Sequence, residues 1–247
     1  MDDMFGLIHS NLDPARKLLT VISCNMIDSL CQLIHRGIDV NAQLQQQNGN
    51  AALHIACEKG HYGCVRVLLE AAANPDLQNN FGFTPLAVAL RNGQAKCVEL
   101  LFSSGSNLSD PQIIWSSQTI SGQQIWHSYN GDMIELLLVA TPSLRDYGDD
   151  MCRDIYFTHI WRSQSLALIK TFFLSGNSLV LFNNRELLPH VEEEMKWWLK
   201  SFSKLHSLQH YARLAIRKHL RPNAIFGAKM LPLPPRMCDY LVFQSHV

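Results

Sequence analysis

Apolar residues recur at helical spacing in two stretches of the chain that align with each other without a gap. The first begins at Gly49 and the second at Gly82, and the same offset holds throughout the aligned stretches. Each stretch predicts two short helices that share one apolar face. Because a single helix pair cannot cover its own apolar face, the pairs must stack on one another. The positions that we expect in this shared core are Leu53, Ala56, Val65, Leu68 and Leu69.

Further copies can be placed by the turn that follows the second helix of each pair. The turns fall near Gly37, Ala72, Gly105, Ser143 and Gly176. Most of the steps between them are close to one period, and the third is the longest. The chain therefore contains about five repeats, two of them clear and the outer ones degenerate. The extra residues of the third step lie between Asp110 and His127. Proline after Asp13 predicts the start of the first helix.

Two departures weaken the repeat pattern locally. Ala51 and Ala52 replace the Thr-Pro pair of the next copy, which removes a capping hydroxyl and a preset φ angle. Ala72 stands at a turn where glycine is expected in a left-handed conformation. That conformation costs a residue with a side chain about 1 kcal/mol. We therefore expect locally reduced stability and an unchanged fold.

The segment Thr84-Pro85-Leu86, the Gly60-His61 turn and the period from Gly49 to Gly82 resemble the ankyrin repeat. The resemblance implies an all-α solenoid in which each repeat has two antiparallel helices and a projecting turn. It also implies that His54, at the histidine position of the repeat motif, bridges neighbouring turns by hydrogen bonds.

The period stops after about Val180, and different patterns follow it. A helix is predicted over residues 186–202, and Met195, Trp198, Leu199 and Phe202 on one face of it would pack against the last repeat. A second helix is predicted to begin at Ser207, which could cap it, and to stop before Pro222. Leu208, Ala212 and Ile216 line one face of this helix because they are four residues apart.

Three prolines, Pro232, Pro234 and Pro235, force an extended connection. The segment Asp239–Leu241 that follows is expected to fold back as a short helix. The two features together resemble a SOCS box. The elongin-binding segment of that family is matched by Ser207, Leu208 and Ile216, whereas Ala212 stands where the family has cysteine and fills less volume. The cullin-binding segment is matched by Leu231, Pro232, Leu233 and Pro234.

Ankyrin repeats followed by these two motifs resemble the ankyrin repeat and SOCS box family. The resemblance implies an ankyrin array over residues 1–185, a connecting helix over 186–204 and a three-helix SOCS box over 205–247. It further implies a non-catalytic substrate-recognition adaptor of a ubiquitin ligase. Its partners would be elongin C with elongin B, cullin five with its RING subunit, and a target protein. The resemblance implies no cofactor.

The target is expected on the concave side of the array or on its projecting turns. The candidate contact residues are Gln78, Asn80, Phe81, Phe83 and Arg91. An exposed Phe81 or Phe83 would suit an anchor, because aromatic residues dominate binding hot spots. Equally, one of the two rings could pack on the adjacent turn. Trp115 and Trp126 could form a separate surface, although we favour a core position for both.

Charge changes this picture in one place. The chain has 21 Lys and Arg against 21 Asp and Glu, which argues against a nucleic-acid-binding protein. Residues 195–237, however, contain nine basic residues and no acidic one. We interpret this stretch first as solvated helix faces and second as a surface for an acidic partner. Glu192, Glu193 and Glu194 would form a solvated helix start.

Composition otherwise points to an intracellular, most simply a cytoplasmic, protein. No uninterrupted apolar run is long enough for a membrane-spanning helix, and the first residues, Met1-Asp2-Asp3, are not those of a signal peptide. Seven cysteines cannot all pair with one another, so reduced thiols are expected.

Metal binding and catalysis find little support in the sequence. Cys57, His61 and Cys64 do not have a standard zinc spacing, and a second pair of ligands is missing. Cys64 and Cys97 are equivalent repeat positions, so we expect buried, inert thiols there, and likewise at Cys24 and Cys31. Two alternatives remain open: an interaction module whose box is a vestigial cap, and an enzyme that carries ubiquitin on a cysteine.

Overall fold

The computed structural model describes residues 14–44, 47–107, 136, 139–140, 165–174, 189–205, 207–220 and 223–242. Within these ranges the chain forms helices and turns, and the predicted all-α fold is confirmed. The chain divides into two compact units, residues 1–128 and 129–247, which are described separately. None of the described helices is long and apolar enough to cross a membrane.

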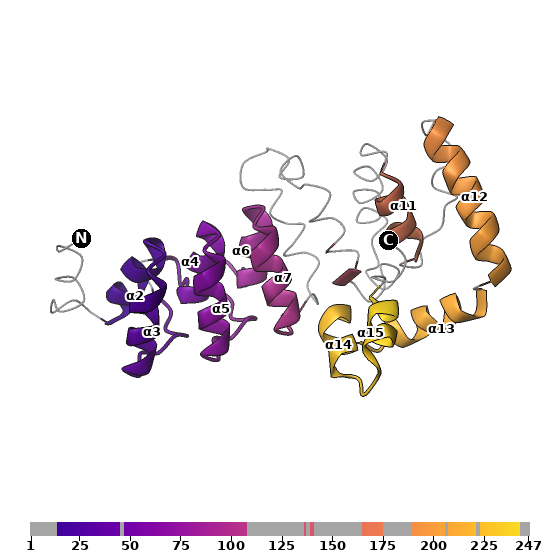
Figure 1. Ribbon diagram of the computed structural model, residues 1–247. Coiled ribbons are helices and arrows are strands. Elements are labelled where there is room, and N and C mark those ends of the chain that lie inside the picture. The colour runs from indigo at the N-terminus through magenta and orange to yellow at the C-terminus, as the bar shows by residue number, and fades with distance from the viewer. Residues whose placement is uncertain are drawn as a thin grey trace. The chain divides into compact units, whose positions relative to one another are not determined.

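Within its described residues, the first unit contains three helix pairs, and Figure 1 shows these helices in indigo to magenta. The pairs are α2 (Pro14–Ser23) with α3 (Ile27–His35), α4 (Ala52–Lys59) with α5 (Tyr62–Glu70), and α6 (Pro85–Arg91) with α7 (Ala95–Ser103). Helices α2, α4 and α6 pack in one row, and α3, α5 and α7 pack in a second row. We call these three pairs the array.

The core of the array is made by the residues that the repeat period predicts. Leu53, Ala56, Val65 and Leu68 are all buried, whereas Leu69 is only partly so. The stacking that the sequence required is therefore present, with the apolar faces of successive pairs closed against each other.

The backbone repeats along with the side chains. Gly37 and Gly105, at the turns after the second helices, have φ angles of 79° and 87°. Ala72, at the equivalent turn of the middle pair, has a φ of 61°. The left-handed alanine predicted from the sequence is confirmed, and this conformation is disfavoured for a residue with a side chain.

The second unit begins its described part with α11 (Leu166–Leu174) and α12 (Pro189–Leu205). Helix α11 ends just before the turn that the sequence places near Gly176, where the repeat period predicts the second helix of a pair. Met195 is buried, and the ring of Trp198 meets that of Phe173 edge-on with 5.6 Å between centroids. The predicted packing of this face of α12 is confirmed for these two residues. The side chains of Leu199 and Phe202 lie outside the described residues.

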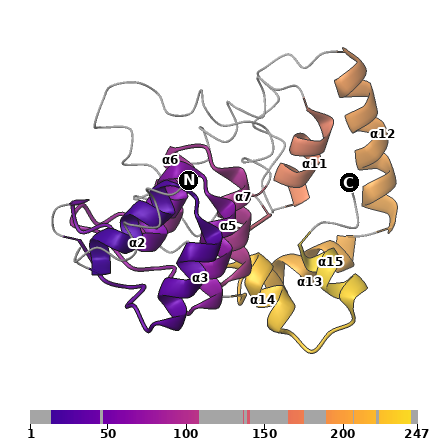
Figure 2. The same ribbon diagram turned by 60° about the vertical axis from the view of Figure 1, so that its left-hand side comes forward.

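Three short helices follow, and we call them the box: α13 (Ser207–Arg217), α14 (Ala224–Met230) and α15 (Pro235–Leu241). Figure 2 shows α14 and α15 in yellow beside α13. The helix expected from Ser207 and the short helix expected near Asp239 are both present. Asn223 caps α14 by accepting a hydrogen bond from the Phe226 N–H at 2.9 Å.

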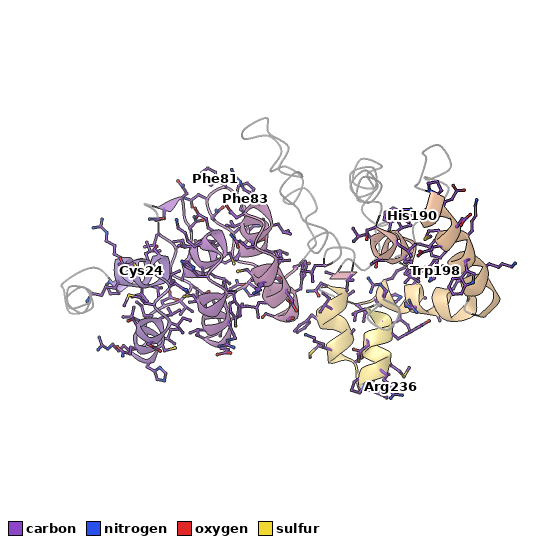
Figure 3. All side chains as sticks on the ribbon, turned by 45° about the horizontal axis from the view of Figure 1, so that its top comes forward. Cys24, Phe81, Phe83, His190, Trp198 and Arg236 are labelled. Atoms are coloured by element: carbon purple, nitrogen blue, oxygen red, sulfur yellow. The ribbon has the colours of Figure 1, made fainter. Side chains whose placement is uncertain are left out.

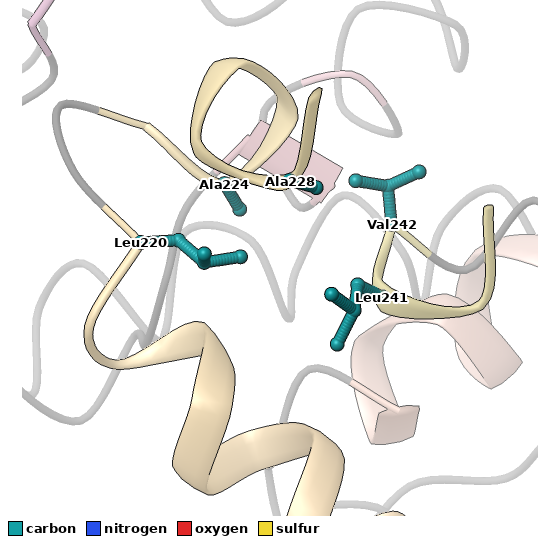
Figure 4. Close-up of a cluster of buried hydrophobic side chains, with 5 residues drawn as sticks. All are labelled: Leu220, Ala224, Ala228, Leu241 and Val242. Atoms are coloured by element: carbon teal, nitrogen blue, oxygen red, sulfur yellow. The ribbon is translucent and has the colours of Figure 1, made fainter. Parts of the chain in front are cut away.

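The core of the box is small. It consists of Leu220, Ala224, Ala228, Leu241 and Val242, which Figure 4 shows converging from α14, the end of α15 and the turn after α13. So few buried side chains are usual for a domain of this size, and such domains need additional contacts to be stable.

Several predictions fall outside the described residues. They concern Asp13, the insertion between Asp110 and His127, Trp115 and Trp126, and the turns at Ser143 and Gly176. The predicted domain boundaries also stay predictions.

Candidate functional site

The projecting turn before α6 is organised by one buried amide. The side-chain oxygen of Asn79 accepts hydrogen bonds from the N–H groups of Phe81 and Phe83, each at 3.0 Å. The Asn79 amide nitrogen donates to the side-chain oxygen of Asn50 at 2.8 Å. Gly82, with a φ of 78°, supplies the left-handed residue that lets the chain reverse here. The turn is therefore fixed before any partner binds.

This turn presents Phe81 to solvent, with 63% of its surface exposed. Phe83 is half-buried, 6.3 Å from the Phe81 ring, and the Arg91 guanidinium lies 5.8 Å above its centroid. Figure 3 shows both phenylalanines on the projecting side of the array. Gln78, Asn80 and Arg91 are exposed as well. The structure thus separates the two rings: Phe81 projects, while Phe83 packs beneath Arg91.

Neighbouring turns are tied together by polar contacts. The buried imidazole of His54 accepts from the Ala51 N–H at 3.2 Å and donates to the Phe83 carbonyl at 3.0 Å. The bridging role implied for His54 is therefore confirmed. Burial lowers the pKa of His54, with hydrogen bonds to the Phe83 and Leu77 backbone partly opposing the shift. The neutral ring matches this pattern of one acceptor and one donor nitrogen.

The cysteines that lie within the repeated helices of the array are buried in its core. Cys57, Cys64 and Cys97 are buried, and burial raises the pKa of the Cys97 thiol to about 11. Such thiols are poor nucleophiles because little thiolate is present at neutral pH. The prediction was wrong for Cys24, which is exposed because α2 ends at Ser23 and leaves it in the following turn. Cys31 is only partly buried.

The suggested metal ligands do not converge. The His61 ring lies 3.4 Å from the Ser23 carbonyl, in contact with backbone of the preceding pair. The Cys64 thiol lies 3.5 Å from the side-chain oxygen of Asn25 and donates to it. Among the residues that the structure describes, no three His, Cys, Asp or Glu side chains are grouped so that they could hold a metal ion.

Helix α13 has two unlike faces. Ala212 and Ile216, two of the predicted elongin-binding residues, lie on an exposed face, and Ile216 has 44% of its surface accessible. Tyr211, which the sequence interpretation did not single out, is 69% exposed beside them. Ser207 and Leu208 are the first two residues of the helix, and their side chains lie outside the described residues. The face of Ala212 therefore presents the aliphatic side chain of Ile216 at the surface.

The opposite face of α13 carries two buried arginines, Arg213 and Arg217. The Arg217 guanidinium donates to the carbonyls of Leu241, at 2.6 Å, and Val139, at 2.9 Å. The Arg213 guanidinium lies 3.6 Å from the centroid of the Tyr240 ring. Burial, with the Arg213 charge adding to it, lowers the pKa of Arg217 to about 9.

These two arginines depart from the interpretation of the basic stretch as solvated helix faces, whereas its other basic residues with described side chains are exposed as expected: Lys196, Lys200, Lys218, Lys229 and Arg236. Both arginines serve the interior of the box, where Arg217 holds the carboxyl end of α15 against α13. Carbonyls at the end of a helix have no partner within it, and a guanidinium can satisfy them. The spacing of the two arginines could have indicated their burial. They are four residues apart and therefore share a side of α13 that differs from the face of Ala212 and Ile216.

The predicted cullin-binding segment runs from the end of α14 to the start of α15. Leu231 and Leu233 are half-buried against the box core, whereas Pro232 and Pro234 are exposed. The segment therefore has an inner side of leucines and an outer side of prolines.

Comparison with known families identifies two domains in the chain. Residues 18–112 match the family model described as ankyrin repeats (3 copies), and residues 205–241 match the model described as SOCS box. No curated protein matches the chain. Both matched domains are non-catalytic protein-interaction modules. The chain therefore contains ankyrin repeats and a SOCS box, the combination of domains that its sequence resembles.

Proposed function

We propose that this chain is the substrate-recognition adaptor of an elongin B/C–cullin–RING ubiquitin ligase. The observation that carries the proposal is the exposed face of α13, where Ala212 and Ile216, two residues of the segment expected to bind elongin, are exposed. Large apolar residues on one face of a short helix are typical of helix-in-groove recognition. The SOCS box and the ankyrin repeats support the two halves of this role.

Elongin C would contact Ser207, Leu208, Ala212 and Ile216, with elongin B attached to elongin C. Leu208 would provide the main apolar contact one helical turn before Ala212. Ala212 contributes less contact area than the cysteine of the family, so we expect a weaker complex than a cysteine would give. Leu231, Pro232, Leu233 and Pro234 would help to select cullin five and its RING subunit.

The target protein would bind the projecting turns of the array. Phe81 is the proposed anchor, because its ring is exposed while Asn79 holds its backbone N–H in place. Gln78 and Asn80 would add hydrogen bonds on one side, and Arg91 above Phe83 would add a cation on the other. The target is otherwise unspecified.

The adaptor would perform no bond chemistry. It would hold a target lysine near a thioester carried by another subunit, and proximity accounts for the rate gain. Buried thiols at Cys57, Cys64 and Cys97 fit this role better than that of a ubiquitin carrier. We place the assembly in the cytoplasm, where such thiols stay reduced.

Co-purification with elongins B and C tests the proposal. The wild-type chain should elute with both elongins, and Leu208→Asp should abolish the complex, since an unpaired carboxylate in an apolar groove is costly. Ile216→Asp should weaken the complex at least tenfold. Because Ile216 is exposed, this substitution should leave the fold of the box intact. Tyr62→Asp is the matched control: Tyr62 in the array is 47% exposed and gains the same charge.

The alternative of a vestigial box makes the opposite prediction. In that case the wild-type chain elutes apart from the elongins, and Ala212→Cys does not restore binding. Our proposal expects Ala212→Cys to tighten binding by about fivefold, as about 1 kcal/mol of added apolar contact would. A reducible ubiquitin adduct on a cysteine of the chain would instead favour the enzyme hypothesis.

A further inference from the structure

The box is completed by residues that come long before it in the chain. Residues 139 and 140 are helical, Ala140 is fully buried, and Val139 packs against the box core. Both residues precede the turn that the repeat period places near Ser143, whereas the match to the SOCS box begins only at residue 205. Part of what holds the box therefore comes from outside the SOCS box segment.

One side chain joins these residues to α13. The Arg217 guanidinium is fully buried and donates to the Val139 carbonyl at 2.9 Å and to the Leu241 carbonyl at 2.6 Å, through two different nitrogens. A guanidinium is planar and rigid, so two carbonyls bound to it are also held relative to each other. Arg217 thus ties together three segments of the second unit: the end of α13, the end of α15 and residues 139–140.

A guanidinium does here what an apolar side chain cannot do. Because the position is fully buried, an apolar side chain could fill it without the cost of burying a charge. Paired bonds from one guanidinium add directional contacts, which fix distances and angles between the backbone groups that accept them. The bonds of Arg217 therefore orient the backbone as well as stabilise it.

Arg217 lies next to the face that we assign to elongin. Ile216 precedes it directly and is 44% exposed, and Ala212 lies one turn earlier on the same exposed face. On the buried side, one turn before Arg217, the Arg213 guanidinium lies 3.6 Å from the centroid of the Tyr240 ring. The buried side of α13 is held at two successive turns, and these contacts set the direction in which the exposed face points.

We propose that Arg217 is a positioning residue, which holds the exposed face of α13 in a fixed direction relative to residues 139–140. That elongin C is the protein bound by this face rests on the proposed function. The orientation itself is a property of the chain before any partner binds. It matters for an adaptor because proximity depends on a fixed geometry, and a box that swivelled would bring a target lysine near the thioester less often.

The distance between two spin labels tests the proposal. A ketone-bearing amino acid, which leaves the native cysteines unlabelled, would replace Leu136, a half-buried helical residue, and Tyr211 on α13, which is 69% exposed. Double electron–electron resonance on the free chain should give one narrow distribution of distances. Arg217→Lys should broaden this distribution about twofold, because an ammonium keeps the charge but lacks the rigid fork that bridges both carbonyls.

Two further variants separate the guanidinium from its surroundings. Val139→Ala removes the side chain that packs on the box core but keeps the carbonyl that accepts from Arg217, so the distribution should stay narrow. Arg236→Lys makes the control substitution at the start of α15, where Arg236 is exposed, and should change nothing. Circular dichroism checks that each variant keeps its helices. If Arg217→Lys loses them, Val139→Ala still decides, since broadening there would mean that packing alone holds the segment.

The outcomes separate this inference from the proposed function. A distribution as narrow in Arg217→Lys as in the wild type, or one that only Val139→Ala broadens, would overturn the positioning role and leave the ligase proposal standing. Elongins B and C that fail to bind the wild-type chain would overturn the ligase proposal, whereas the distances in the free chain would still decide the role of Arg217.

Discussion

The array and the box bury their polar groups in different ways. In the array the buried His54 and Asn79 are neutral, and they hydrogen-bond to the backbone or side chains of neighbouring turns. In the box the buried groups include two cations, Arg213 and Arg217, held by backbone carbonyls and an aromatic ring. Repetition lets the array spread stability over many equivalent contacts, whereas the small box depends on a few strong ones.

The largest effect should come from a cavity in the array. Leu68→Ala removes a fully buried side chain and should lower the free energy of unfolding of the array by about 4 kcal/mol. Hydrogen exchange followed by mass spectrometry should show the loss in α4 to α7 and leave the box protected. Equal loss in the box would mean that the two regions unfold together.

Arg217→Met should destabilise the box and leave the array unchanged, with a slightly smaller loss of stability than Leu68→Ala causes. It removes two charge-assisted hydrogen bonds, to the carbonyls of Leu241 and Val139, and leaves both acceptors buried. We expect the free energy of unfolding of the box to fall by about 3 kcal/mol. Hydrogen bonds to charged groups are worth about 1.5–3 kcal/mol each, and removing the cost of burying the guanidinium charge offsets part of their loss. Hydrogen exchange should increase in α13 and α15 while α4 and α5 are unchanged. A stabilised box would contradict the structural role of Arg217.

Acid should weaken the array through His54. Its pKa is lowered in the fold, so below about pH 6.5 the unfolded chain takes up a proton that the folded chain resists. The free energy of unfolding should then fall by up to about 1.4 kcal/mol per pH unit until the folded pKa is reached. Urea unfolding at pH 7.5 and pH 5.5 measures this loss. His54→Ala should remove this part of the pH dependence, and an unchanged slope would contradict the assignment.

The smallest effect concerns the left-handed turn. Ala72→Gly should raise the stability of the array by about 0.5–1 kcal/mol, because glycine adopts a φ of 61° without steric cost. Gly37→Ala, at the equivalent turn of the first pair, is the mirror control and should lower stability by a similar amount. Differential scanning calorimetry would detect both shifts, and a destabilised Ala72→Gly would contradict the account.

The period made the array the more predictable region. Equivalent residues one repeat apart, such as Cys64 and Cys97, had to occupy equivalent sites, and both are buried. The left-handed Ala72 followed from the same logic. Cys24 could not be placed this way, since the period does not say whether a residue at a helix end turns inward.

The box was predictable in its helices and not in its interior. Proline and helical spacing located α13 and α15, but a count of basic residues could not tell a buried guanidinium from a solvated one. Burial of Arg213 and Arg217 depends on Tyr240 and on the carbonyl of Leu241, which come together only in the folded box. The division of the Leu231–Pro234 segment into inner leucines and outer prolines likewise required the core around Ala228.

We propose that elongin C binds the exposed face of α13. Hydrogen exchange of the chain with and without purified elongins B and C would locate the contact. Our account predicts added protection in residues 207–217 and no change in α4 to α6. Protection confined to the array, or none anywhere in α13 at saturating elongin, would contradict it.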